Sequence, residues 1–125
     1  MSDARSVLLV EDDEGIRHVV AEVLTVEGYE VRQAEDGRGA LAALTDWSPD
    51  VILLDLMMPG MDGWQFRAEQ RARNCALDVP LIVLSASRRA GDAIEDLGAV
   101  AVIPKPFDLD ALLEVVDHYA ARFPS

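Results

Sequence analysis

Short apolar runs alternate with amphipathic segments along the chain. Four of these runs are rich in valine, isoleucine and leucine and are almost uninterrupted: Val7–Val10, Val51–Leu54, Leu81–Leu84 and Val100–Ile103. Continuous runs of this length are typical of strands that are buried on both faces, as in a parallel sheet. A fifth segment, Tyr29–Ala34, alternates between apolar and polar residues, which predicts a strand at an edge of that sheet.

The segments between these runs have apolar residues at helical spacing. One helix is predicted from Ile16 to Leu24, with Gly28 after it as a C-terminal cap, and another from Leu109 to Ala120. Weaker patterns predict helices around residues 40–44 and 94–97.

The segment after Asp62 is also predicted to be helical, with Asp62 as its N-terminal cap, although Gln70 and Arg73 make its apolar face narrow. The strand–helix unit is therefore repeated five times along the chain. Alternation of this kind predicts an α/β fold in which a doubly wound, five-stranded parallel sheet carries five helices on its two faces.

Composition limits the possible functions. The chain has 125 residues, half of them hydrophobic, and a formal net charge of −12, which fits a single domain over residues 1–125 without a separate output domain. The negative charge argues against direct binding to nucleic acid or to an anionic membrane surface. No segment approaches the roughly 20 apolar residues of a membrane span. Cys75 is the only cysteine, so no internal disulfide can form, and we expect a cytoplasmic protein.

Polar side chains gather where the predicted strands end, at the edge where open α/β sheets bind ligands. Along the chain these residues are Glu11, Asp12, Asp13, Asp55, Ser85 and Lys105. Crowded carboxylates raise one another's pKa, and Mg²⁺, a hard cation that prefers oxygen ligands, relieves their repulsion. A carboxylate can attack phosphorus and form an acyl phosphate when a cation neutralises the negative charge of the incoming phosphoryl group.

Four motifs resemble the receiver domain of bacterial response regulators, in order and over almost the whole chain. They are Val7–Asp13, Val51–Gly63, Leu84–Ala86 and Lys105–Phe107. The resemblance implies the flavodoxin-like strand order 2-1-3-4-5, which the periodicity does not give. It also implies a phosphoacceptor switch of a two-component or phosphorelay system, rather than an enzyme. A histidine kinase or a histidine phosphotransfer protein would be the donor, and the phosphorylated state would alter the binding of an unknown downstream protein or pass the group on.

The resemblance also implies a role for each residue of the site. Asp55 is the phosphoacceptor. Asp12, Asp55 and the backbone carbonyl of Met57 are ligands of Mg²⁺, and Glu11 acts through water. Lys105 and Ser85 contact phosphoryl oxygens. Asp13, in contrast, is expected to be a loop acid that caps the first helix.

Two departures from the family pattern affect how phosphorylation is read out. Family members often carry an aromatic residue three positions before the lysine, where this chain has Val102. The stretch from Ser85 to Lys105 is also shorter than in many members, which predicts a stunted helix after residue 88. Members of the family dimerise through this face, so we expect a monomer here.

Other functions conflict with particular residues. An aspartyl-phosphate phosphatase typically has a second acid two residues after the nucleophile, where this chain has Met57. A flavin- or nucleotide-binding module would need glycines and hydroxyls after the first strand, but the acids from Glu11 to Asp13 repel a phosphate. The remaining alternative is a binding module that is not phosphorylated, although this chain retains Asp12, Asp55, Ser85 and Lys105.

Overall fold

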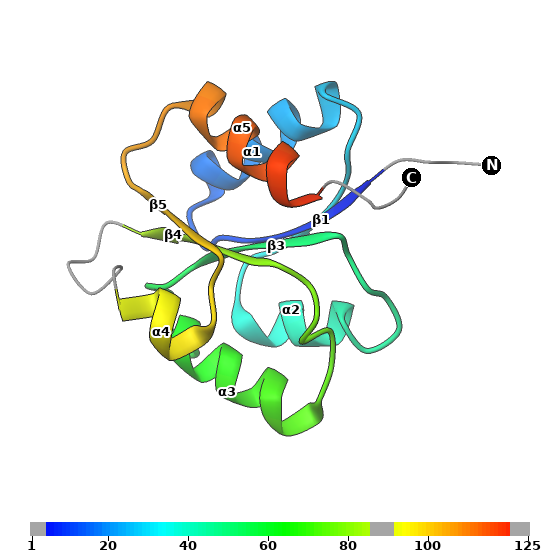
Figure 1. The fold of residues 1–125 in the computed structure, drawn as a ribbon, viewed down its shortest axis with the longest axis vertical. Coiled ribbons are helices and arrows are strands. Elements are labelled where there is room, and N and C mark those ends of the chain that lie inside the picture. Colours follow the sequence, from blue (N-terminus) through cyan, green and yellow to red (C-terminus); the bar gives the residue numbers. More distant parts are fainter. Residues whose placement is uncertain (1–4, 86–91, 121–125) are drawn as a thin grey trace.

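A computed structural model describes residues 5–85 and 92–120 of the chain. A parallel five-stranded sheet lies at its centre, with the strands in the order β2-β1-β3-β4-β5 (Figure 1). The predicted fold class and the strand order implied by the resemblance are both confirmed. The strands are β1 (Ser6–Val10), β2 (Glu30–Ala34), β3 (Val51–Asp55), β4 (Leu81–Ser85) and β5 (Ala101–Pro104).

Helices cover both faces of the sheet. Figure 1 shows two of them on one face, α1 (Glu14–Val26) and α5 (Leu109–Ala120). The other face carries α2 (Gly37–Ala43), α3 (Gly63–Arg73) and α4 (Ala93–Leu97). With five residues, α4 matches the prediction of a short helix between β4 and β5. Within residues 5–85 and 92–120, none of the helices combines the length and the apolar character that a membrane crossing requires.

Alternate side chains of the central strands pack into two hydrophobic clusters, one on each face. In β1, Leu8 and Val10 join the cluster under α2, α3 and α4, whereas Val7 and Leu9 join the cluster under α1 and α5. Every residue of β1, β3 and β4 is buried, as the continuous apolar runs predicted. In β2, which forms one edge of the sheet, only Ala34 is buried. The alternating pattern therefore identified one edge strand correctly. The continuous run Val100–Ile103 was wrong as a sign of burial on both faces, because β5 forms the other edge of the sheet and only Ile103 among its residues is buried.

Aspartates start the helices that flank the site. Asp13 precedes α1 and accepts a hydrogen bond from the amide of Ile16 at 2.9 Å. Asp62 precedes α3 and forms a capping box with Gln65, which satisfies two amide groups at the helix start. Gly28 follows α1 with a φ of +98°, a conformation that favours glycine. The predicted N-terminal caps Asp13 and Asp62 are thus confirmed, and they fix where two loops of the site end. At the other end of α1 the capping residue is Glu27, and Gly28 directly follows it.

Buried polar side chains explain how α3 packs despite its narrow apolar face. Arg67 and Gln70 are 5% and 0% exposed. Arg67 donates from Nε to the carbonyl of Leu97, at the end of α4, and from Nη1 to Oε1 of Gln70, both at 2.8 Å. Gln70 in turn donates to the carbonyl of Ala76 at 3.2 Å. Hydrogen bonds therefore replace apolar contacts where α3 meets α4.

Candidate functional site

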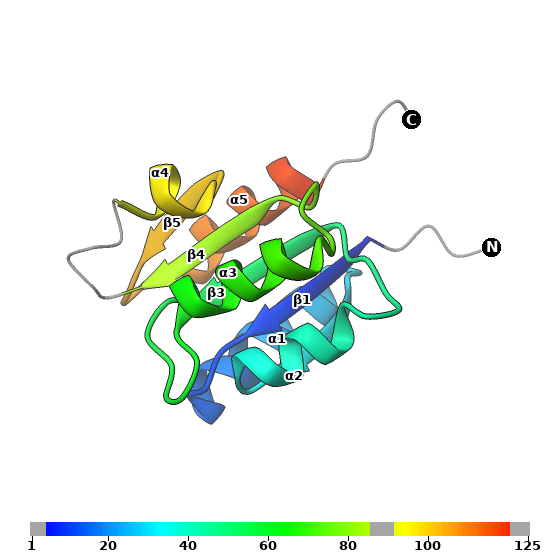
Figure 2. The ribbon, with the colours of Figure 1, turned by 90° about the horizontal axis from the view of Figure 1, so that it is seen from below.

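The strands bring the predicted polar residues to one edge of the sheet. Figure 2 shows the arrowheads of β1 and β4 at the same edge. Asp55 is the last residue of β3 and Ser85 is the last residue of β4. Glu11 directly follows β1, and Lys105 directly follows β5. Because all five strands are parallel, their carboxyl ends meet at this edge, as the sequence predicted.

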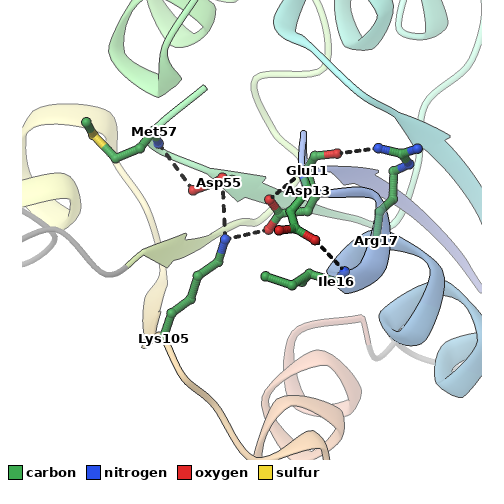
Figure 3. Close-up of polar contacts among 7 residues, drawn as sticks. All are labelled: Glu11, Asp13, Ile16, Arg17, Asp55, Met57 and Lys105. Atoms are coloured by element: carbon green, nitrogen blue, oxygen red, sulfur yellow. Dashed lines mark hydrogen bonds and ion pairs between the residues drawn. The ribbon is translucent and has the colours of Figure 1, made fainter. Parts of the chain in front are cut away.

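Three carboxylates and one ammonium group form the centre of the site, and Figure 3 draws Glu11, Asp55 and Lys105 among them. Glu11, Asp12 and Asp55 each have a carboxylate oxygen within 4.8 Å of the others. Lys105 places its Nζ 2.6 Å from Oε1 of Glu11 and 3.4 Å from Oδ2 of Asp55. Asp12 is exposed, whereas Glu11 and Asp55 are buried, at 0% and 4% exposure. The site therefore consists of a buried acid pair that opens to solvent on the side of Asp12.

Burial of Asp55 follows from its position in the sheet. It ends the central strand β3, so β1 and β4 lie on either side of it. Burial is the largest cause that raises the pKa of Asp55, and the hydrogen bond and the charge of Glu11 raise it further. The charge of Lys105 and the amide of Met57 act in the opposite direction, and the resulting pKa is about 7. Without a further cation, Asp55 is therefore partly protonated at neutral pH.

Lys105 remains charged in this environment. Burial by itself lowers the pKa of its ammonium group, but the hydrogen bond to Glu11 and the charges of Asp55 and Glu11 outweigh burial and raise the pKa above the ordinary value. The backbone holds the residue as well, because the amide of Lys105 donates to the carbonyl of Ser85 at 3.0 Å. Ser85 itself is 1% exposed. Lys105 and Ser85 thus flank Asp55 from β5 and β4.

Met57 contributes its backbone to the site. Its amide donates to Oδ1 of Asp55 at 3.2 Å (Figure 3), while its side chain is 60% exposed. The turn that follows Asp55 therefore folds back on the carboxylate. Gly63, at the start of α3, donates to the carbonyl of Leu56 at 2.8 Å, and this bond ties the same turn to α3.

The donor set fits a hard divalent cation. Three carboxylates offer one oxygen each within 4.8 Å of one another, and oxygen ligands of this kind suit Mg²⁺. A cation there would also offset the repulsion that raises the pKa of Asp55. Asp13 has a different role, because its Oδ1 accepts the amide of Ile16 at the start of α1. Its predicted function as a helix cap is confirmed.

Sequence reasoning missed one contributor, Arg17. From the first turns of α1, its Nη1 donates to the carbonyl of Glu11 at 2.9 Å (Figure 3). This bond holds the loop that carries Glu11 and Asp12. No motif marks Arg17, and only its place on the helix that directly follows the acidic loop could have indicated the contact.

Comparison with known proteins establishes the family. The family model of the response regulator receiver domain matches residues 7–117. The chain therefore belongs to the response regulator receiver domain family. The members of this family that it resembles are response regulators, so the chain has the role of a phosphoacceptor in signalling.

Among curated proteins, the regulatory protein AtoC of Escherichia coli is 35% identical over 118 residues, which cover 93% of this chain and 25% of AtoC. The response regulator MprA of Mycolicibacterium vanbaalenii is 37% identical over 109 residues, which cover 86% of this chain and 46% of MprA. The chain thus spans between a quarter and a half of the length of these relatives.

Solved structures agree with this assignment over nearly their full length. The chemotaxis protein CheY4 of Vibrio cholerae has a TM-score of 0.84 and 33% identity, covering 93% of this chain and 98% of CheY4. The response regulator TrrA of Thermotoga maritima, in complex with Mg²⁺ and BeF, has a TM-score of 0.80 and 31% identity, covering 92% of this chain and 98% of TrrA. Receiver domains interact with histidine kinases and downstream effectors, and this holds for the family as a whole.

Proposed function

We propose that Asp55 accepts a phosphoryl group from a phosphohistidine donor, with Mg²⁺ held by Asp12, Asp55 and the backbone carbonyl of Met57. The observation that carries the proposal is a buried carboxylate, Asp55, with the ammonium of Lys105 3.4 Å from it and two further carboxylates beside it. The complex of TrrA with Mg²⁺ and BeF supports the choice of metal. When bound, Mg²⁺ supplies positive charge that offsets the negative charge of the carboxylates and the phosphoryl oxygens.

The transfer itself requires little beyond position and charge. A carboxylate oxygen of Asp55 forms a bond to phosphorus while the bond between phosphorus and the donor's imidazole nitrogen breaks. The imidazole keeps the electron pair and takes up a proton, and Asp55 becomes an acyl phosphate. Lys105 then binds one phosphoryl oxygen, and the hydroxyl of Ser85 binds another. Asp55 must be ionised to attack, so a cation that lowers its raised pKa favours the reaction.

Turnover of external phosphoesters is not part of the proposal. A phosphatase of this type needs a general acid close to the nucleophile. Two residues after Asp55 the chain carries Met57, a thioether with no proton to give, and its side chain points into solvent at 60% exposure. The chain therefore acts as a switch that is phosphorylated and slowly loses the group.

An apolar groove beside the site supports a protein as the donor. The groove has a volume of about 750 Å³ and lies between the start of α1 and the segment that follows Lys105. Ile16, Val19 and Phe107 line it, and Asp13 and Lys105 join it to the site. An apolar surface of this size next to the phosphoacceptor suits a helix of a histidine kinase or a histidine phosphotransfer protein. A small phosphodonor would not need such a surface.

Intact mass measurement tests the proposal. The wild type and Asp55→Asn are incubated with acetyl phosphate, with and without Mg²⁺, and Asp46→Asn, at an exposed position, is the control. We expect a single phosphoryl adduct on the wild type and on the control, only with Mg²⁺, and none on Asp55→Asn. A wild type that binds Mg²⁺ but gains no adduct would overturn the proposal. That outcome would favour a receiver fold that binds partners without phosphorylation.

A further inference from the structure

Glu11 is held by the protein through both its backbone and its side chain. Its side chain is fully buried. Its amide donates to the carbonyl of Ala34 at 3.0 Å, and its carbonyl accepts from Arg17 at 2.9 Å. Oε2 accepts from the amide of Asp13 at 3.2 Å, and Oε1 accepts from Lys105 at 2.6 Å (Figure 3). Every polar group of Glu11 therefore has a partner within the protein.

The ammonium of Lys105 is closer to Glu11 than to Asp55. The two distances are 2.6 Å and 3.4 Å, and a charge-assisted hydrogen bond is strongest at the shorter of these distances. Glu11 is thus the principal counter-ion of Lys105, and Asp55 is a secondary one. A contact of 2.6 Å between Lys105 and Asp55 would occupy the carboxylate that has to attack phosphorus more tightly than the observed contact of 3.4 Å does.

We propose that Glu11 is a positioning residue that holds the Lys105 ammonium beside Asp55 and keeps the contact between Lys105 and Asp55 the longer of the two. The inference deepens the proposed function and rests on it. Glu11 holds Lys105 ready for a phosphoryl oxygen on Asp55. The 3.4 Å contact of Lys105 with Oδ2 of Asp55 is more easily displaced by the metal and the donor than a 2.6 Å contact would be. The same carboxylate binds the amide of Asp13, so it also fixes the loop that presents Asp12. This role differs from the contact to Mg²⁺ through water that the family resemblance implies.

The sequence provides a clean probe, because Lys105 is the only lysine in the chain. Labelling with ε-¹⁵N-lysine therefore gives one side-chain ammonium signal. This signal reports on the hydrogen bonds of Lys105 in the protein without metal and without phosphorylation. In the wild type we expect a signal that is protected from exchange with water, because Lys105 is bonded within the site.

A matched pair of isosteric variants identifies the counter-ion. Glu11→Gln should abolish the protected signal, whereas Asp55→Asn should keep it. Loss of the signal in Asp55→Asn with its retention in Glu11→Gln would overturn the inference. Glu11→Asp guards against misfolding of the first variant, because it keeps the charge but is one methylene too short for the 2.6 Å contact. It should lose the signal as well.

A double-mutant cycle tests the consequence for the reaction. With acetyl phosphate and saturating Mg²⁺, Glu11→Gln should slow phosphorylation on the order of tenfold, the size expected for one charge-assisted hydrogen bond. In the Lys105→Met background the same substitution should have no further effect, because Glu11 acts through Lys105. An equal effect in both backgrounds would overturn the inference and indicate a role at the metal. If the wild type is not phosphorylated at all, the proposed function fails, and the ammonium signal still decides the role of Glu11.

Discussion

Replacing Asp55 by asparagine should stabilise the metal-free protein at neutral and alkaline pH. Burial, followed by the hydrogen bond and the charge of Glu11, raises the pKa of Asp55 from 3.8 to about 7. The folded protein therefore binds this proton more tightly than the unfolded chain does. For a carboxyl group with a raised pKa, stability is lost as the pH rises from the unfolded value to the folded value. The penalty thus develops between 3.8 and about 7, and it is complete above that range.

The magnitude follows from the size of the shift. From 3.8 to about 7 is about three pKa units, and each unit corresponds to about 1.4 kcal/mol. The full penalty above the folded pKa is therefore about 4 kcal/mol, and at about pH 5 it is about 2 kcal/mol. Asparagine has nearly the same shape and no charge, and its amide oxygen can still accept the amide of Met57. We expect the free energy of unfolding of Asp55→Asn to exceed that of the wild type by about 2–4 kcal/mol at about pH 8 and by about 1 kcal/mol at about pH 5.

Urea unfolding in the presence of a chelator measures this difference. The free energies of unfolding of the wild type and Asp55→Asn are compared at both pH values, and Asp46→Asn serves as an exposed control that should differ little from the wild type. Adding Mg²⁺ at the higher pH should reduce the difference in free energy of unfolding between Asp55→Asn and the wild type, because a cation favours ionised Asp55. A difference that is equal at both pH values, or larger at the lower pH, would refute the reasoning. It would show that protonation of Asp55 does not determine the pH dependence of stability.

Three further substitutions test how the site is supported. Arg67→Met should lower the free energy of unfolding by about 2 kcal/mol, because the Leu97 carbonyl and the amide oxygen of Gln70 lose their buried donor. Amide hydrogens of α4 should also exchange faster with water. Arg38→Met, at an exposed position, should change neither quantity. Gly63→Ala should cost about 1–3 kcal/mol in the same urea assay, because a Cβ there would lie 2.6 Å from Cδ2 of Leu56 and 3.0 Å from its Cα; unchanged stability would contradict this reading. Asp62→Ala should lower the free energy of unfolding by about 1 kcal/mol, because the N-terminal cap of α3 is lost. Asp62→Asn should keep most of the wild-type stability, because asparagine also caps helices, and thermal unfolding measures both effects.

The fold was predictable because its main signals are local. Uninterrupted apolar runs of four residues indicate strands covered on both faces, and Val7–Val10 and Val51–Leu54 are completely buried. The run Val100–Ile103 is an exception, because β5 lies at an edge of the sheet, a position that the run itself does not reveal. The alternation in Tyr29–Ala34 was enough to place that strand at an edge. Strand order was different, because it depends on how distant strands pair, and periodicity carries no information about that. Only the resemblance supplied it.

The site was predictable at the level of residues but not of contacts. Parallel strands bring their ends together, so Asp55, Ser85 and Lys105 were expected to meet. No local pattern could tell that Lys105 lies nearer to Glu11 than to Asp55, because this depends on distances between β1, β3 and β5. Arg67 was missed for a similar reason. A charged residue in a helix normally faces solvent, and its burial depends on a carbonyl acceptor 30 residues away in the chain.

Lysine and arginine are distributed in a way that agrees with the proposed use of Lys105. Apart from Lys105, the 11 lysine and arginine residues of the chain are all arginine. Arginine has a planar fork of donors that binds a carboxylate in two places and stays charged, as suits Arg67 and Arg17, which hold backbone carbonyls. A compact ammonium, in contrast, has three N–H donors, so Lys105 can contact Glu11 and Asp55 and still donate to a phosphoryl oxygen. A guanidinium beside Glu11 would fill the space between the carboxylates that a metal and a phosphoryl group need. The chain thus has its single lysine at the position where one small charge must be shared.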